Sequence, residues 1–188
     1  MITTSQNFAA SNVGDSYYTP PWCYENLPID WSNYKTAMEP SMGDGRLFLF
    51  LEEQGLLVDG RDPIWQGEGL CNTEDFFEWD GYVDLIIGNP PFSKAQAFIE
   101  YSLPRCKTLI FLLRLNFLGS KKRMKFWQAN TPDKLFVCSK RPSFNGKGTD
   151  SCDYGWYVWQ NENKYIDSGF EWIDNNQGKI SGELCLNK

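Results

Sequence analysis

The chain has 188 residues, a formal net charge of −6 and no histidine, and its length suits one domain with a single core. No apolar run is long enough for a transmembrane helix, and the start lacks the basic and apolar regions of a signal peptide, so a soluble cytoplasmic protein is predicted. The negative charge argues against nucleic-acid binding over the whole surface, and without histidine or a C-x-x-C pair the six cysteines are expected to be reduced and mostly buried rather than zinc ligands.

The two ends of the chain are expected to lie outside the folded domain. Residues 1–16 are polar, rich in Asn and Ser, and are predicted to form an N-terminal arm. The domain is predicted to span residues 17–175, followed by a C-terminal tail at 176–188. At its start, Thr19 precedes a proline and should be extended, and residues 22–27 are expected to form a short helix.

A strand, a glycine-rich loop and a helix are predicted between residues 36 and 54. The strand ends at Glu39, the loop contains Gly43 and Gly45, and the helix begins at residue 46. Such a corner binds ligands in doubly wound sheets, although this one matches neither a dinucleotide fingerprint nor a P-loop. Because Glu39 and Asp44 would repel phosphate, the loop should favour a cation, such as a sulfonium that carries an amino group.

Acidic side chains also follow the next predicted strands. Residues 55–59 are expected to form the second strand, and either Asp59 or Asp62 would accept hydrogen bonds from ribose hydroxyl groups, with the choice left open by the sequence. After a third strand, Asp75 could contact an adenine amine with Phe76 beside the adenine ring. The alternative is a loop with aromatic core anchors.

The strongest signal is the sequence Asn89-Pro90-Pro91-Phe92, which ends an apolar run of strand length. Proline forbids helix at the preceding residue, and neither proline has an N–H for a strand ladder. The segment is therefore predicted to be a stiff loop at the end of a buried strand. It offers the Asn89 side-chain oxygen, the Pro90 carbonyl oxygen and the flat ring of Phe92.

Two acceptors beside an aromatic ring suit a planar target with an exocyclic amine. The acceptors would take the two amine hydrogens, and the ring would stack on the target. In adenine the N6 lone pair is delocalised, so hydrogen bonds from N6 to Asn89 and Pro90 would favour a pyramidal nitrogen and stabilise the charge that develops as it attacks. No base is needed before the attack, which fits a chain without histidine. A purely structural turn is the alternative reading of this motif.

Basic residues cluster after the next helix and strand. Residues 93–103 are expected to form a helix, and residues 108–113 a central parallel strand that ends at Arg114 and Asn116. Ligands bind at this edge of open α/β sheets. A helix just past that edge opens with a basic cluster that is predicted to contact phosphate: Lys121, Lys122 and Arg123.

The last predicted strands cover residues 134–138 and 154–159, which could pair as an antiparallel hairpin on the sheet edge. The loop between them is rich in glycine and contains Arg141 and Lys147, which could reach a nucleic acid. After residue 161 the chain is polar, with a few aromatic anchors.

Four of these motifs, taken in chain order, resemble those of class I S-adenosylmethionine-dependent methyltransferases. The likeness is strongest to the DNA N6-adenine methyltransferases, especially small phage-type enzymes. The motifs are Tyr-Tyr-Thr-Pro at 17–20, Glu-Pro-Ser-Met-Gly-Asp-Gly at 39–45, Asp-Phe-Phe at 75–77 and Asn-Pro-Pro-Phe at 89–92. Residues 112–117 and 156–159 are also similar to those enzymes.

The resemblance implies an α/β fold, a single-domain Rossmann-like methyltransferase with a mostly parallel seven-stranded sheet, an antiparallel last strand and helices on both faces. It implies direct methyl transfer from S-adenosylmethionine to N6 of an adenine flipped out of duplex DNA. Catalytic roles would fall to Asn89, Pro90, Pro91 and Phe92. Cofactor contacts would come from Tyr18, Thr19, Pro20, Glu39, Pro40, Ser41, Gly43, Gly45, Asp59, Asp62, Asp75, Phe76 and Asn89. Nucleic-acid contacts are expected from Arg114, Asn116, Lys121, Lys122, Arg123, Arg141 and Lys147.

Other readings keep part of this picture. An RNA adenine or a protein glutamine also offers a planar amine to Asn-Pro-Pro, and a non-catalytic nucleotide-binding or interaction module could retain the fold. No separate target-recognition domain is expected from these 188 residues. Sequence choice would then depend on residues 114–125 and 141–153 or on a second copy of the chain, or it would be loose; the oligomeric state, including a homodimer, is left open.

Overall fold

The computed structural model describes residues 18–63, 72–144, 148–162 and 164–173. The predicted arm, the predicted tail and Lys147 lie outside these residues. The strands are β1 (Thr36–Glu39), β2 (Leu57–Gly60), β3 (Val83–Gly88), β4 (Cys106–Arg114), β5 (Lys134–Cys138), β6 (Tyr154–Gln160) and β7 (Gly169–Ile173). The α-helices are α1 (Trp22–Glu25), α2 (Arg46–Glu53), α3 (Ala95–Ser102) and α4 (Met124–Ala129). Short 3₁₀ turns include η2 (Phe76–Glu78), η3 (Phe92–Lys94), η5 (Leu115–Phe117) and η6 (Lys121–Arg123).

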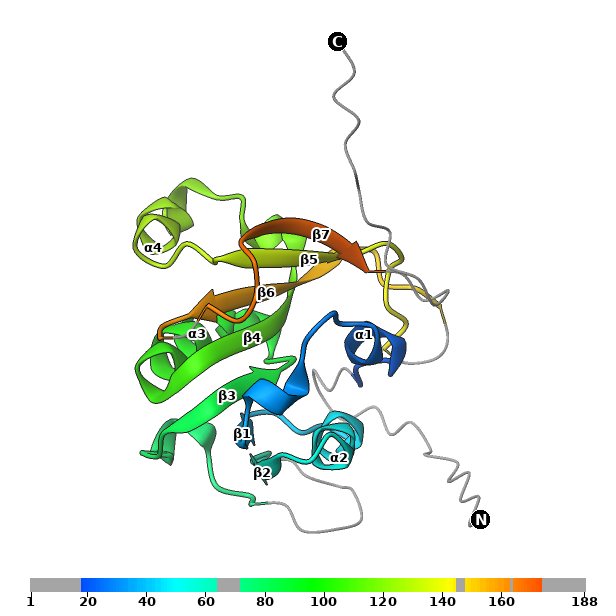
Figure 1. Ribbon diagram of the computed structural model, residues 1–188. Helices are drawn as coiled ribbons and strands as arrows, with labels where there is room; N and C mark the ends of the chain where they lie inside the picture. The colour runs from blue at the N-terminus through cyan, green and yellow to red at the C-terminus, as the bar shows by residue number, and fades with distance from the viewer. Residues whose placement is uncertain (1–17, 64–71, 145–147, 163, 174–188) are drawn as a thin grey trace.

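The seven described strands form one sheet in the order β2-β1-β3-β4-β6-β5-β7 (Figure 1). The pairs β1–β2, β1–β3, β3–β4 and β5–β7 are parallel, whereas β6 is antiparallel to both β4 and β5. The predicted single α/β domain with a mostly parallel seven-stranded sheet is therefore confirmed. The one antiparallel strand is β6, which is the sixth in the chain, and the last strand, β7, is parallel to its neighbour.

Two strand predictions need correction. The segments β5 and β6 do pair antiparallel, but β6 inserts between β4 and β5, so the pair is not a hairpin on the edge of the sheet. Strand β7 occupies that edge and was not predicted. The predicted third strand before residue 73 falls mostly outside the described residues, and at its borders a single bridge joins Arg61 to Asn72.

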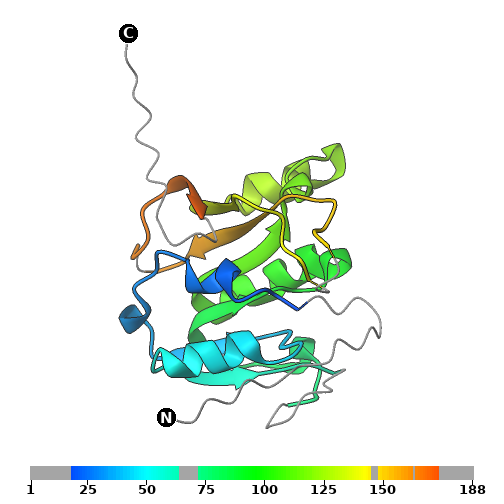
Figure 2. The same ribbon diagram turned by 90° about the vertical axis from the view of Figure 1, so that its right-hand side faces the viewer.

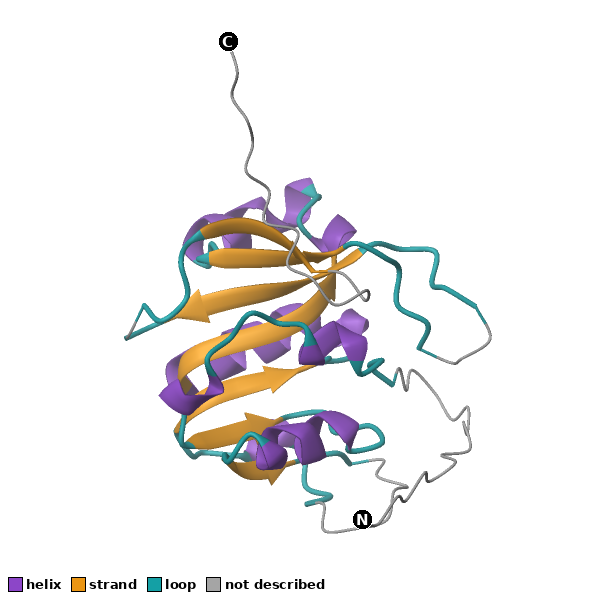
Figure 3. Ribbon diagram, turned by 45° about the vertical axis from the view of Figure 1, so that its right-hand side comes forward, coloured by secondary structure: helices purple, strands orange, loops and turns teal. Residues whose placement is uncertain are grey.

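Helices cover both faces of the sheet (Figures 1 and 3). One core layer joins α1 and α2 to the sheet through residues such as Tyr24, Leu51 and Ile87. Figure 2 shows these two helices on the side of the sheet that faces the viewer. The other layer joins α3 and α4 to the opposite face, with Phe98 and Phe126 among its residues. The central strands β3 and β4 are buried between the layers, as expected for parallel strands covered on both sides.

A buried tryptophan in β6 connects α1 to the middle of the sheet. Trp156 is fully buried, and its indole Nε1 donates a hydrogen bond to the backbone oxygen of Cys23 at 2.8 Å. Four cysteines in the described part of the chain are free, and three of them are buried, as predicted: Cys23, Cys106 and Cys138. The described residues contain no cluster of side chains suited to a metal ion, and none of the described helices is long and apolar enough to cross a membrane.

Candidate active site

The candidate site lies where the chain changes direction across the sheet. From β1 the chain runs to β2 on one side and then returns to form β3 on the other side. The loops that follow the carboxyl ends of adjacent strands β1 and β3 therefore frame a crevice, which is where ligands bind in open α/β sheets. They are in contact, because the Ser41 hydroxyl donates a hydrogen bond to the backbone oxygen of Asn89 at 3.1 Å. The glycine loop and the Asn-Pro-Pro-Phe segment thus face the same crevice.

The loop after β1 is shaped by two glycines in the left-handed region. Gly43 has a φ of 57° and Gly45 a φ of 79°, backbone conformations that residues with a Cβ rarely adopt. The Gly45 N–H donates to the Met42 carbonyl oxygen at 2.9 Å, which closes the turn just before α2. The Gly43 N–H donates to Asp62 Oδ2 at 2.8 Å. This bond ties the loop to the segment that follows β2.

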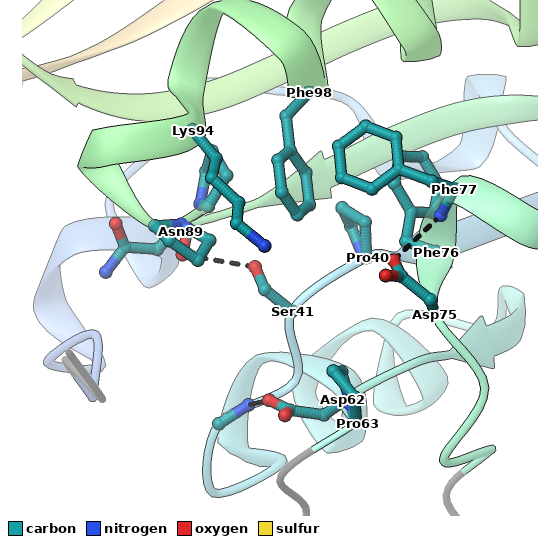
Figure 4. A pocket seen from close by; sticks show the side chains of 13 residues that line it. Pro40, Ser41, Asp62, Pro63, Asp75, Phe76, Phe77, Asn89, Lys94 and Phe98 are labelled. Carbon is teal, nitrogen blue, oxygen red and sulfur yellow. Dashed lines mark hydrogen bonds between the residues drawn. The ribbon is translucent and has the colours of Figure 1, made fainter. Parts of the chain in front are cut away.

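The Asp62 cavity, named for one of its walls, occupies about 180 Å³ between these loops (Figure 4). Its acidic side chains are Asp62 and Asp75, and the Lys94 side chain extends into it from the start of the α3 region. The residues that line it are Pro40, Ser41, Gly43, Asp62, Pro63, Asp75, Phe76, Phe77, Asn89, Pro90, Pro91, Lys94 and Phe98.

Aromatic rings form one wall of the Asp62 cavity. The Phe76 ring is buried and stacks on Phe98, with ring centroids 5.5 Å apart and an interplanar angle of 15°. Asp75 caps the short turn η2 by accepting a hydrogen bond from the Phe77 N–H at 3.0 Å, and this fixes both residues at the cavity wall. An apolar wall beside a carboxylate fits a planar heterocycle that carries hydrogen-bond donors.

The Glu39 recess adjoins this cavity and shares three residues with it: Ser41, Gly43 and Asn89. Its other walls are Tyr18, Thr19, Glu39, Met42, Asp44 and Leu47, and its free volume is about 10 Å³. Glu39 Oε2 is buried there and has no hydrogen-bond partner among the described residues. A buried carboxylate oxygen without a donor indicates a site that a cationic or hydrogen-bonding ligand would complete.

Burial raises the pKa of the Glu39 carboxyl well above its usual range, and the nearby carboxylates of Asp44 and Asp62 add to this shift. A hydrogen bond from the Phe48 backbone opposes it. The surroundings of Glu39 within the protein therefore favour the protonated acid, whereas an ammonium group placed beside it would favour the carboxylate.

The Glu39 shift predicts a pH dependence of stability. Because the folded-state pKa exceeds the unfolded one, the ligand-free protein should be most stable below the usual carboxyl pKa and should lose stability as pH rises from there towards the folded pKa. Glu39→Gln should flatten this decline when the free energy of urea unfolding is measured between pH 5 and pH 8. The exposed neighbour variant Glu53→Gln should keep the wild-type profile. Equal profiles for all three proteins would contradict the assigned role of Glu39.

The Arg114 cavity lies on the other side of the Asn-Pro-Pro-Phe segment and has a volume of about 410 Å³. Phe92 and Ser93 form its wall towards that segment, and Arg114, Asn116 and Arg123 face them from the end of β4 and the turns that follow. Its lining is completed by Ala95, Leu113 and Phe117, so the described residues that line it include two arginines and no acid. Three of the predicted nucleic-acid contacts are therefore brought to one place.

The ring of Phe92 is not an open plate, which corrects the sequence prediction. The Arg114 guanidinium lies over it, with Cζ 4.5 Å from the ring centroid. Tyr154 and Phe144 pack against the same ring at centroid distances of 5.4 Å and 6.3 Å. A planar target therefore meets the guanidinium before it meets this face of the ring.

Several predicted contacts lie away from the cavities. Asp59 is exposed within β2 and lines none of them, so of Asp59 and Asp62 only Asp62 borders the cavity. Pro20 and Gly45 shape turns beside the recess without lining it. Lys121 and Lys122 are exposed on η6 beside Arg123, whereas exposed Arg141 forms an ion pair with Asp153 at 2.8 Å.

Four residues that line the Asp62 cavity were not among the predicted site residues: Pro63, Phe77, Lys94 and Phe98. Two of them, Lys94 and Phe98, come from a segment to which the sequence assigned no role at the site. Both lie in the segment that follows the prolines, and the helical spacing of Phe98 pointed only to a core position. A lysine five residues after Asn89 carries no motif of its own. Only the return of α3 over the crevice places both side chains beside the glycine loop.

Comparisons with known structures identify the fold. No protein-family model matches the chain, and a search of curated proteins found no match. A Listeria monocytogenes protein assigned to the class I S-adenosylmethionine-dependent methyltransferases is similar, with a TM-score of 0.59, 12% identity, and coverage of 87% of this chain and 68% of that one. A protein assigned as the modification subunit of a type I restriction enzyme from Vibrio vulnificus YJ016 gives a TM-score of 0.59 at 11% identity, covering 86% of this chain and 48% of that one. A dimethyladenosine transferase from Plasmodium falciparum gives 0.51 at 15% identity, covering 77% and 62%. The chain therefore has a Rossmann-like methyltransferase fold.

Proposed function

We propose that the protein transfers a methyl group from S-adenosylmethionine to the exocyclic N6 of adenine in DNA. The observation that carries this proposal is the position of the Asn-Pro-Pro-Phe segment between two cavities. Asn89, Pro90 and Pro91 line the Asp62 cavity, and the next two residues, Phe92 and Ser93, line the Arg114 cavity. A group bound on one side would thus meet a group bound on the other at Asn89 and Pro90.

The side chains of the Asp62 cavity and the Glu39 recess suit the chemical groups of S-adenosylmethionine. Glu39 and Asp44 would face the cationic amino acid end, and the buried Oε2 of Glu39 would gain the donor that it lacks among the described residues. Asp62 would accept the ribose hydroxyl groups, and Asp75 with Phe76 would hold the adenine. When bound, S-adenosylmethionine supplies a methyl group on a sulfonium that leaves as a neutral thioether, and the surplus proton of the methylated nitrogen passes to solvent.

The acceptor chemistry belongs to Asn89 and Pro90. The Asn89 side-chain oxygen and the Pro90 carbonyl oxygen would accept the two hydrogens of the target amine. Because the Pro90–Pro91 pair restricts the backbone, the carbonyl oxygen is held in a fixed direction and needs little reorganisation as charge develops on nitrogen. The protein contributes acceptors and orientation, with no general base required before the attack.

Charge is divided between the two sides of the segment, and this division supports a nucleic-acid substrate. The donor side carries three acids, Glu39, Asp62 and Asp75, and one lysine, Lys94, so acids predominate there. The Arg114 cavity carries Arg114 and Arg123, which suit a polyanion. The net charge of −6 therefore does not describe the acceptor side. The name of one structurally similar protein, a dimethyladenosine transferase, also refers to adenosine.

The direct test is methyl uptake. The protein is incubated with S-adenosylmethionine labelled in the methyl group and, separately, with duplex DNA, single-stranded DNA, RNA or a protein extract. Label in DNA that is recovered as N6-methyladenine after hydrolysis is expected. Label that appears only in RNA would move the proposal to an RNA adenine, label only in protein would favour a glutamine acceptor, and no label in any of them would contradict methyl transfer to these substrates.

The exposed lysines on η6 should contribute to DNA binding through phosphate contacts. Replacing Lys121 and Lys122 by glutamine should reduce the slope of log affinity against log salt by about two, since each phosphate contact contributes about 0.9. The affinity is measured by fluorescence anisotropy of labelled duplex DNA at salt concentrations from about 50 to about 200 mM.

A charge-matched control uses the opposite end of the sheet. Lys35 precedes β1 and Lys164 follows β6, and both are exposed. The double variant Lys35→Gln/Lys164→Gln should leave the salt slope at its wild-type value. If both double variants change the slope equally, the effect comes from net charge and not from a contact at η6.

A further inference from the structure

Arg114 is held rigidly by a network that extends into the segment before β6. Its Nε donates to the Tyr154 hydroxyl oxygen at 3.0 Å, and its Nη2 lies 3.7 Å from Asp150 Oδ2. The Tyr154 hydroxyl in turn donates to Asp150 Oδ2 at 2.9 Å, and Asp150 Oδ1 accepts from the Cys152 N–H at 3.0 Å. Each partner of the guanidinium is therefore itself fixed, so its plane has little freedom.

The Arg114 guanidinium makes contacts beyond its ion pair with Asp150. It covers the Phe92 ring, with Cζ 4.5 Å from the centroid, and it also lines the Arg114 cavity. Its side chain remains 31% exposed and borders the cavity. Phe92 also packs against the core layer of α1 and α2. The accessible planar surface beside Asn89 and Pro90 is thus supplied by Arg114 together with the ring beneath it.

We propose that Arg114 is the platform on which the acceptor base stacks, with Phe92 as the support under the guanidinium. This inference deepens the proposed function and rests on it. A guanidinium is planar and delocalised, stacks on aromatic rings and is more weakly hydrated than an ammonium group. Bases splayed out of a strand stack on arginine planes as well as on aromatic side chains. The Tyr154 and Asp150 contacts orient the plane before the base arrives, which reduces the ordering cost of binding.

The platform makes a prediction that a phosphate contact does not make. A stacking residue should matter only when a base is present, whereas a phosphate contact should matter equally for a strand that lacks the base. The probe is a single-stranded five-nucleotide DNA with one central dA, compared with the same strand carrying an abasic site at that position. Calorimetry in the presence of S-adenosylhomocysteine, the thioether that has no methyl group to transfer, measures both dissociation constants without turnover.

The wild-type protein should bind the dA strand about 10- to 100-fold more tightly than the abasic strand, as expected for one stacked base. Arg114→Met keeps the length of the side chain but removes the plane and the charge, and Arg114→Lys keeps the charge alone. Both variants should lose most of the preference for dA. Tyr154→Phe, which removes the acceptor of the Nε hydrogen bond, should lose part of it.

A matched control variant is available at Arg105, which lies just before the start of β4, whereas Arg114 ends that β-strand. Arg105 also stacks on an aromatic ring, with Cζ 3.7 Å from the Tyr101 centroid, but it is hydrogen-bonded to the Trp79 and Tyr101 carbonyl oxygens before β4 begins. Arg105→Met should leave both dissociation constants unchanged. The melting temperature of each variant shows whether it is folded under the conditions of the titration.

Two results would overturn the platform. If Arg114→Met weakens the binding of both DNA strands equally, and Arg114→Lys binds both with wild-type affinity, Arg114 binds phosphate. If Arg114→Met keeps the full preference for dA while DNA still accepts methyl groups, the base stacks elsewhere and the proposed function stands. Equal wild-type affinity for both strands, together with no methyl uptake by DNA, would instead refute the proposed function itself.

Discussion

Asn89→Ala is expected to lower the rate of methyl transfer by about 10²- to 10³-fold, the usual cost of removing one preorganised hydrogen-bonding group at a transition state. The lost interaction is strongest when positive charge develops on the attacking nitrogen, so the chemical step should suffer most. Binding of S-adenosylmethionine should persist, because Glu39, Asp62 and Asp75 remain in place.

Single-turnover transfer to DNA and calorimetric titration with S-adenosylmethionine separate these two effects. Asn89→Asp provides the matched variant, because it keeps a side-chain oxygen at the same position and should retain more activity than Asn89→Ala. An alanine variant that no longer binds S-adenosylmethionine would show that Asn89 serves the donor and not the amine. Wild-type turnover in that variant would remove Asn89 from the reaction altogether.

Trp156→Ala is expected to reduce the free energy of unfolding by about 3–5 kcal/mol, the range for deleting a large buried aromatic side chain. Trp156 is fully buried in the core layer of α1 and α2, and its loss also leaves the Cys23 carbonyl oxygen without this donor. Because α1 follows Tyr18 and Thr19, loosening it should also disturb the Glu39 recess.

Urea unfolding followed by circular dichroism measures the loss of stability. Trp172→Ala is the matched control, since Trp172 is 47% exposed on the edge strand β7 and its removal should cost far less. Trp156→Phe retains much of the apolar volume but not the hydrogen bond, so its stability should lie between wild type and Trp156→Ala. Equal losses for Trp156→Ala and Trp172→Ala would contradict the role of Trp156 as a core anchor.

The parts of the site that could be predicted from sequence are those fixed by local chemistry. Pro90 and Pro91 end β3 whatever surrounds them, and Gly43 and Gly45 adopt conformations that other residues avoid. These local constraints place both segments at the carboxyl ends of buried strands. The order of the strands then brings them together, as the hydrogen bond from Ser41 to the Asn89 carbonyl oxygen shows.

The parts that could not be predicted depend on the return of distant segments. The covering of Phe92 requires Arg114 and Tyr154, which follow it by 22 residues or more and pair across β4 and β6. Strand β7 buries only Ile173 among its five residues, so it lacks the alternating apolar pattern that marks a strand. The choice between Asp59 and Asp62 depended on where β2 ends, which is at Gly60.

The segment between the two cavities has a thermodynamic consequence. Coupling that is transmitted through the protein requires an element with two arrangements that both ligands can bias. Here the shared wall contains Pro90 and Pro91, whose backbones are restricted before either ligand arrives. The wall is thus fixed, and any coupling between donor and acceptor binding should come from the contact between the methyl group and the target amine, not from movement of the wall.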